Sequence, residues 1–179
     1  MNKIALLLGA AVLCGTLTAA ECRWLNKELP ASKTELKQWW HQNLAGGTIT
    51  FLEKGGPNGR NAVEVIGKDL KKNCQFVLYF RPENLKGKRV RLSAQCKAEN
   101  VGASNALSGI KFMVNYQLEG SPNWNFGEGK FPKKGSFDWM PIETVKDIPE
   151  NASKLAIYIA VQGTGKATFS DIRLEILEK

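Results

Sequence analysis

Several stretches of the chain alternate apolar and polar residues with a period of two, which is typical of half-buried β-strands. In the clearest run, every second residue from Val90 to Ala98 is apolar and the residues between them are polar. Similar runs cover 110–118, 155–161 and 166–177, and shorter ones cover 48–53, 61–67, 74–81 and 137–145. The run 166–177 changes phase near 169–171, which predicts a β-bulge there.

These runs predict about eight or nine short strands joined by turns rich in Gly, Pro and Asn. A helix is expected only within 32–41, where the pair Trp39 and Trp40 could equally begin a strand, with one ring facing inward and one outward. His41 is expected at the surface. Strands without intervening helices favour an all-β protein, an antiparallel β-sandwich. With no internal repeat or linker, residues 21–179 are expected to form one domain.

The first twenty of the 179 residues have the pattern of a signal peptide. Lys3 supplies the positive charge, residues 4–12 the apolar stretch, and 18–20 the small residues of a cleavage site near Ala20. Roughly ten apolar residues are too few for a membrane span, which needs about 20. We therefore expect a secreted or periplasmic protein without a membrane span.

The cysteines have several alternative interpretations in an exported chain, because oxidising compartments allow disulfides to persist. If the runs 74–81 and 88–99 formed a plain hairpin, Cys74 would lie opposite Cys96 and the two could form a disulfide. Cys22 could instead pair with either of them. Small buried free thiols are the third interpretation.

Charge and composition exclude some classes of function. The net charge is +8, but the basic residues fall in separate clusters at 68–72, 86–89 and 130–134. A nucleic-acid-binding protein needs a continuous basic face, so no nucleic-acid partner is expected. The clusters indicate either a solvated basic surface or attraction to anionic glycans or an anionic cell envelope.

A set of residues in the second half of the chain resembles carbohydrate-binding modules of the family 4, 9, 16 and 22 type. The matching positions are Gly109–Met113, Trp124, Gly135–Trp139, Ile148–Pro149, Leu155, Gly163–Gly165 and Phe169–Glu175. Looser matches in the first half are Trp39–Trp40, Asn58–Val65, Leu85–Gly87 and Arg91–Gln95. The resemblance implies a jelly-roll sandwich with a galactose-binding-domain-like fold. It specifies the ligand far less than the fold.

Sugar sites need aromatic faces for stacking and planar amides or charges for hydrogen bonds to hydroxyl groups. Tyr158 and Gln162 lie on the polar side of their strand run, and Trp124 lies in a loop rich in Gly, Pro and Asn. The same reasoning selects further polar residues on the neighbouring runs, namely Arg91, Gln95, Asn115 and Gln117. We therefore predict a site in which Trp124 and Tyr158 stack on sugar rings and these polar residues bind hydroxyl groups.

Modules of this type often hold a structural calcium ion through an Asp near the final strand, and Asp171 occupies that position of the motif. The resemblance implies a calcium ligand at Asp171, and the alternative is an Asp in a turn at a strand edge. No other cofactor is expected.

The sequence also lacks the residue pattern of a jelly-roll glycanase, which places carboxylates at i, i+2 spacing on one strand face. The candidate carboxylates never align in this way and include Glu119, Glu128, Asp138, Glu143 and Asp147. His41 is the only histidine, so the sequence offers a single candidate for the base of a Ser-His-Asp triad. We predict a non-catalytic protein that binds a polysaccharide or oligosaccharide, in the company of secreted glycoside hydrolases. The alternative is an interaction or adhesion module that docks a protein or cell-envelope partner.

Overall fold

The computed structural model describes residues 22–178, so the predicted signal peptide lies outside the described residues. The ordered elements are α1 (Lys33–Leu36), β1 (Trp40–Asn43), β2 (Thr48–Leu52), β3 (Ala62–Phe80), β4 (Arg89–Gly102), β5 (Gly109–Leu118), β6 (Trp124–Asn125), β7 (Gly135–Asp147) and β8 (Ala152–Leu177). Short 3-10 helices occupy Leu44–Gly46, Pro57–Gly59 and Glu83–Leu85. Within this part of the chain, no helix is long and apolar enough to cross a membrane.

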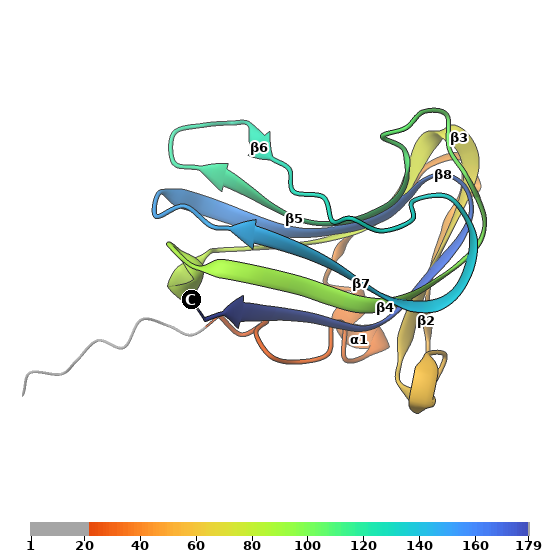
Figure 1. Cartoon of the computed structure of the whole chain (residues 1–179), viewed down its shortest axis with the longest axis horizontal. Coiled ribbons are helices and arrows are strands. Elements are labelled where there is room, and N and C mark those ends of the chain that lie inside the picture. Colours follow the sequence, from red (N-terminus) through yellow and green to blue (C-terminus); the bar gives the residue numbers. More distant parts are fainter. Residues whose placement is uncertain (1–21, 179) are drawn as a thin grey trace, which may run out of the picture.

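Two long strands, β3 and β8, run through both layers of an antiparallel β-sandwich (Figure 1). In one layer, residues 73–80 of β3 lie between β1 and the first half of β8, and β5 and β6 follow. In the other, residues 62–68 of β3 lie between β2 and the second half of β8, and β4 and β7 follow. We call these layers the β5 sheet and the β4 sheet. The all-β antiparallel sandwich predicted from the sequence is confirmed.

Two glycines allow β8 to continue from one sheet into the other. Gly163 and Gly165 have φ angles of 145° and 92°, a region that residues with a side chain rarely adopt. A Cβ atom at Gly163 would lie 2.0 Å from the carbonyl oxygen of Gly102, and one at Gly165 would lie 2.3 Å from that of Asn100. Glycine at both positions therefore lets β8 pass close to the end of β4, joining two runs that the sequence pattern separates.

The hydrophobic core lies between the two sheets, and the alternation predicted for β4 is confirmed. The inward residues Val90, Leu92, Ala94, Cys96 and Ala98 are at most 5% exposed. Across the core, Phe112 of β5 stacks on Phe169 of β8, with ring centroids 6.0 Å apart and planes inclined by 7°. These two rings tie the β5 sheet to the β4 sheet.

The segment before β1 divides its two tryptophans between the core and the surface. Ser32 caps the short helix α1 by accepting a hydrogen bond from the Glu35 amide at 3.1 Å. Trp39 is buried against Phe76, with ring centroids 5.2 Å apart, whereas Trp40 is 46% exposed. The predicted split of this pair is confirmed, and His41 is exposed as expected.

The predicted bulge near 169–171 is also present. Ser93 pairs with Arg173, but Gln95 pairs with Ser170, so β8 has one residue more than β4 at this point. Asp171, with a φ angle of 51°, lies in this extra length of chain. The bulge re-aims the side chains that follow it on the outer face of the β4 sheet.

The predicted disulfide between Cys74 and Cys96 is wrong. Strands β3 and β4 do not form a hairpin, because β8 lies between them in the sheet. Cys74 pairs with Val161 in the β5 sheet and Cys96 with Phe169 in the β4 sheet. Both carry free thiols, and both side chains are buried in the core.

These two thiols are expected to resist alkylation in the folded protein. Burial raises the pKa of Cys74 to about 11 and that of Cys96 to about 12, and only the thiolate reacts. With iodoacetamide at about pH 8, peptide mass mapping will find Cys74 and Cys96 unmodified in the native chain and modified in urea. Rapid labelling of Cys96 without denaturant would contradict the burial described here.

Candidate functional site

The outer face of the β5 sheet gathers aromatic, amide and charged side chains from five segments. Strand register fixes the rows across this face. Trp40 is level with Val77, Tyr158 and Met113, and Met113 forms a bridge with Glu128. Because side chains on one strand alternate between faces, the residues two positions away along each strand share this outer face.

Three aromatic rings form a continuous row on this face, two of them exposed and the third, Trp124, half-buried. The ring centroids of Trp40 and Tyr79 are 6.4 Å apart, and those of Tyr79 and Trp124 are 5.8 Å apart. Tyr79 is 51% exposed and Trp40 46% exposed, so these rings are not core residues. We call Trp40, Tyr79 and Trp124 the aromatic row.

Small residues of β8 form the floor on which these rings approach one another. Tyr79 pairs with Ala156, which in turn pairs with Asn115 of β5. Ala156 and Ala160 point outward but are only 2% and 0% exposed, because larger neighbours cover them. A side chain longer than alanine at position 156, beside Tyr79, would lift the aromatic row away from the sheet, whereas Ala160 lies between Gln75 and Lys111.

A polar cluster lies beside the aromatic row. The Tyr158 hydroxyl donates a hydrogen bond to Oε1 of Gln75, and Nδ2 of Asn73 donates to the same oxygen at 3.2 Å and to the Tyr158 hydroxyl at 3.3 Å. Burial raises the pKa of Tyr158 to about 12, so its hydroxyl is neutral at physiological pH. We call Asn73, Gln75 and Tyr158 the amide–phenol cluster.

The chain that follows β6 lies along β5 and brings Glu128 to this face. The amide of Gly127 donates to Oδ1 of Asn115 at 3.3 Å, and Nζ of Lys146 donates to the carbonyl of Phe126 at 3.0 Å. The side chain of Asn115 is thus engaged in holding this segment. Glu128 then accepts hydrogen bonds from both Lys111 and Lys133.

Glu128 is held ionised between its two lysines. Partial burial opposes ionisation, but the hydrogen bonds and positive charges of Lys111 and Lys133 outweigh it, so the pKa of Glu128 lies below its ordinary value of 4.5. A carboxyl group with a low pKa is a poor proton donor. Among the described residues that line this cleft it is also the only carboxylate, so the two-carboxylate arrangement of a glycosidase is not assembled there.

The ion pairs of Glu128 are expected to make stability depend on pH. A carboxyl whose pKa is lowered on folding contributes stability that is complete above its unfolded pKa and is lost as pH falls through the folded value. Replacing Glu128 by glutamine will therefore cost stability at about pH 6 but not at about pH 3. Thermal melts across this range check it, with the exposed Glu119→Gln as control. An equal loss of stability at the two pH values would show that the ion pairs of Glu128 do not cause the loss.

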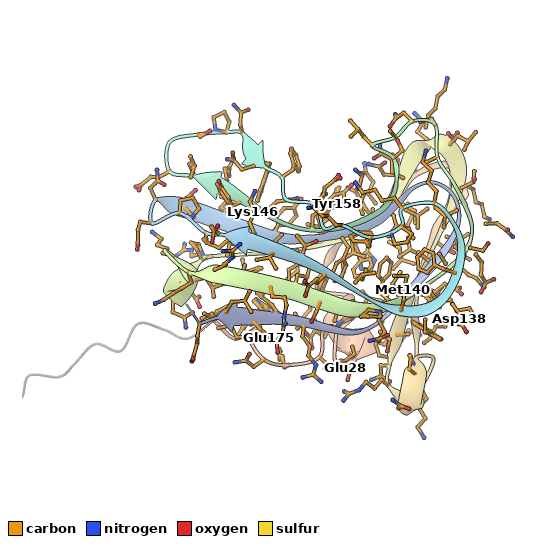
Figure 2. All side chains as sticks on the ribbon, viewed as in Figure 1. Glu28, Asp138, Met140, Lys146, Tyr158 and Glu175 are labelled. Carbon is orange, nitrogen blue, oxygen red and sulfur yellow. The ribbon has the colours of Figure 1, made fainter. Side chains whose placement is uncertain are left out.

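The amide–phenol cluster, Lys111 and Glu128 line a cleft of about 500 Å³ on the outer face of the β5 sheet. Its walls are Asn73, Gln75, Leu107, Lys111, Met113, Phe126, Glu128, Tyr158 and Gln162. Leu107 and Phe126 at the rim are 73% and 64% exposed. Figure 2 shows Tyr158 above Glu175, with Tyr158 in the sheet that contains β5 and Glu175 near the C-terminal end of β8.

Five of the seven predicted binding residues share this face. Tyr158 and Gln162 line the cleft, and Trp124 belongs to the aromatic row. Asn115 and Gln117 alternate with the residues of β5 that enter the core between the sheets, Val114 and Tyr116, and therefore point outward as well. Their role in ligand binding stays a prediction, but the structure does bring these five together.

Arg91 and Gln95 lie elsewhere, on the outer face of the β4 sheet. Arg91 forms an ion pair with Glu175 at 2.7 Å, and both Arg91 and Gln95 line a separate cleft of about 510 Å³. They face outward on β4 as predicted, but β4 belongs to the opposite sheet. The prediction that they join Trp124 and Tyr158 in one site is wrong.

The surroundings of Asp171 do not fit a calcium ion. Its Oδ1 accepts a hydrogen bond from Nε of Arg173 at 2.7 Å and lies 3.3 Å from Nη1 of Arg60. Calcium takes six to eight oxygen ligands, and two guanidinium groups at the carboxylate repel a cation. In residues 22–178 no group of three or more His, Cys, Asp or Glu side chains is arranged to hold a metal.

Several residues of this face were not among the predicted ones. Tyr79, Gln75 and Lys111 each alternate with buried neighbours in their strand, so the period-two rule that selects Tyr158 also selects them. Glu128 carries no such signal. The position of Glu128 depends on how the chain after β6 packs against β5. The alternation of residues within a single strand carries no information on that packing.

Several solved structures with the same fold are carbohydrate-binding modules. The family 22 and GH10 modules of endo-1,4-β-D-xylanase 10B of Clostridium thermocellum, solved with xylohexaose, match with a TM-score of 0.58 and 18% identity over 87% of this chain and 29% of that one. The C-terminal family 22 module of the same enzyme matches with a TM-score of 0.56 and 11% identity over 87% and 95% of the two chains. A family 16 module matches with a TM-score of 0.53 and 15% identity over 80% and 92%.

This likeness confirms the jelly-roll β-sandwich and the resemblance to carbohydrate-binding modules of the family 16 and 22 type. Because the sequence identities are only 11–18%, the likeness shows a shared fold and nothing about the ligand. No protein-family model matches the sequence, and no curated protein matches it either.

Proposed function

We propose that this protein binds a polysaccharide on the outer face of the β5 sheet, without chemical turnover, as a secreted carbohydrate-binding protein. The observation that carries the proposal is the aromatic row, Trp40, Tyr79 and Trp124, beside a cleft lined by amide, hydroxyl and charged groups. The solved structures with this fold include a pair of family 22 and GH10 modules complexed with xylohexaose, which makes xylan the first polysaccharide to test.

The aromatic row suits the apolar faces of sugar rings. Stacking a pyranose C–H face on an aromatic ring removes apolar surface of both from water, which is favourable by about 25 cal/mol per Å². Trp40 and Tyr79 are half exposed, and Ala156 lies beside Tyr79, so binding would not require these rings to leave the core. A row of rings also offers more than one stacking position along a chain of sugars.

The cleft suits the hydroxyl groups. The side chains of Asn73, Gln75 and Gln162 contribute both donors and acceptors, and Tyr158 contributes a neutral hydroxyl. The hydrogen bonds within the amide–phenol cluster fix these groups before a ligand arrives, which lowers the entropy cost of binding. Stacking supplies affinity in this arrangement, and the amides supply orientation.

A polysaccharide screen tests the proposal. The chain from residue 21 would be run in native affinity gels containing xylan, β-glucan, mannan, galactan or pectin, together with Tyr79→Ala and the control Val145→Ala, whose side chain is exposed on β7. We expect at least one polysaccharide to retard the wild type and the control and to retard Tyr79→Ala less. No retardation by any polysaccharide would overturn the proposal and favour a module that docks a protein partner. A pull-down with secreted glycoside hydrolases would then test that class of partner.

A further inference from the structure

Basic side chains lie in and beside the cleft on the β5 sheet. Lys111 lines it, and Lys154 points outward from β8 level with Gln117. Among the described residues lining the cleft, Glu128 is the only acid, and it is shared between Lys111 and Lys133. One carboxylate between two ammonium groups leaves this triad with a net charge of +1.

Lys111 is an unusual residue for a strand face. It is only 8% exposed, although lysine is almost never buried without a partner. Within residues 22–178, the hydrogen bond of its Nζ goes to Glu128. An ammonium group has three N–H donors, so two remain for a ligand in the cleft. A single lysine would suffice to pair Glu128, and Lys133 already does so from the other side.

We propose that the ligand of this cleft is an acidic glycan, and that a uronic acid carboxylate binds the ammonium group of Lys111. This inference rests on the proposed function and specifies its substrate class. Lys111 lies one row from Tyr158, since Tyr158 pairs with Met113 and Ala160 pairs with Lys111. The substituents of a sugar ring bound at the amide–phenol cluster would therefore lie near Lys111.

The energetics favour a charged group over a hydroxyl at this position. Hydrogen bonds between ionised partners are shorter and roughly twice as strong as neutral ones. Lys111 is largely withdrawn from water, so solvent screens its charge less than that of an exposed lysine. Glu128 opposes the incoming carboxylate, and Lys133 offsets that repulsion. The preference for an acidic glycan over a neutral one therefore depends on the charge of Lys111. The charge of Glu128 only weakens this preference.

The test compares one polysaccharide in two forms, glucuronoxylan and the same glucuronoxylan after chemical reduction of its carboxyl groups. Polygalacturonate and its carboxyl-reduced form make a second pair. Binding would be measured by calorimetry at about 0.15 M salt, where the Debye length is about 8 Å. The variants are Lys111→Gln, Glu128→Gln and the control Lys134→Gln, which removes the same charge from an exposed lysine beyond the cleft.

We expect the wild type to prefer the acidic form of at least one pair by about tenfold. Lys111→Gln will lose this preference, Glu128→Gln will increase it, and Lys134→Gln will keep it. Equal binding of both forms by the wild type, or an unchanged preference in Lys111→Gln, would overturn the inference and leave the proposed function standing. Failure of the wild type to bind either form of either pair, or any neutral polysaccharide of the screen, would overturn both.

Discussion

Replacing Trp124 by alanine is expected to lower affinity for the bound polysaccharide by about thirtyfold, a loss of about 2 kcal/mol. Trp124 contacts Tyr79 at the edge of the aromatic row, so the substitution removes one stacking surface and the support of its neighbour. Because the ring is only half-buried, on the two-residue strand β6, few core contacts are lost. Calorimetry with the polysaccharide found in the screen measures the change.

The matched control for this prediction is Trp139→Ala. Trp139 is also a half-buried tryptophan on an edge strand, but it lies on β7 in the β4 sheet. Replacing Trp139 removes a similar area of aromatic surface, but we expect the affinity for the polysaccharide to stay unchanged. Equal losses in the two variants would place the ligand elsewhere, and a collapse of the thermal transition in Trp124→Ala would make this residue structural.

Replacing Phe112 by alanine is expected to have the largest effect on stability. Phe112 is fully buried, stacks on Phe169 of the opposite sheet, and also contacts Phe131 edge-on at 6.4 Å. Removing a buried phenylalanine side chain typically costs about 3–5 kcal/mol, because the cavity closes only in part. That is a large share of the about 5–15 kcal/mol by which most domains are stable.

Urea denaturation followed by fluorescence measures this loss as a lower midpoint with an unchanged slope. Phe126→Ala is the control, since Phe126 belongs to the neighbouring segment but is 64% exposed. It is expected to change stability by no more than about 0.5 kcal/mol. A loss below about 1 kcal/mol in Phe112→Ala would contradict the account of a core in which this ring pair joins the sheets.

The strands and their buried faces could be predicted from the sequence because alternation is a local signal. It placed Tyr158 and Asn115 correctly on outward faces, and the same rule extends to Tyr79. The phase change near Asp171 likewise marked a real bulge. In each case the information lies within a few residues of the feature it predicts.

Which strands are neighbours could not be obtained in this way. Gln95 and Tyr158 both face outward, but period two reports the face of a single strand and not the sheet to which the strand belongs. The insertion of β8 between β3 and β4 separates Cys74 from Cys96, and it joins residues far apart in the sequence. The position of Glu128 beside Lys111 depends on a similar long-range contact.

The five tryptophans give the most direct test of the binding face, because they are distributed over the molecule. Trp40 and Trp124 belong to the aromatic row, whereas Trp24 and Trp39 are buried and Trp139 lies on the opposite sheet. Each indole N–H gives its own signal in a proton–nitrogen NMR spectrum. On titration with an oligosaccharide of the polysaccharide found in the screen, the account predicts shifts of the Trp40 and Trp124 signals alone. Shifts confined to Trp139 or Trp24 would contradict it and move the site to another face.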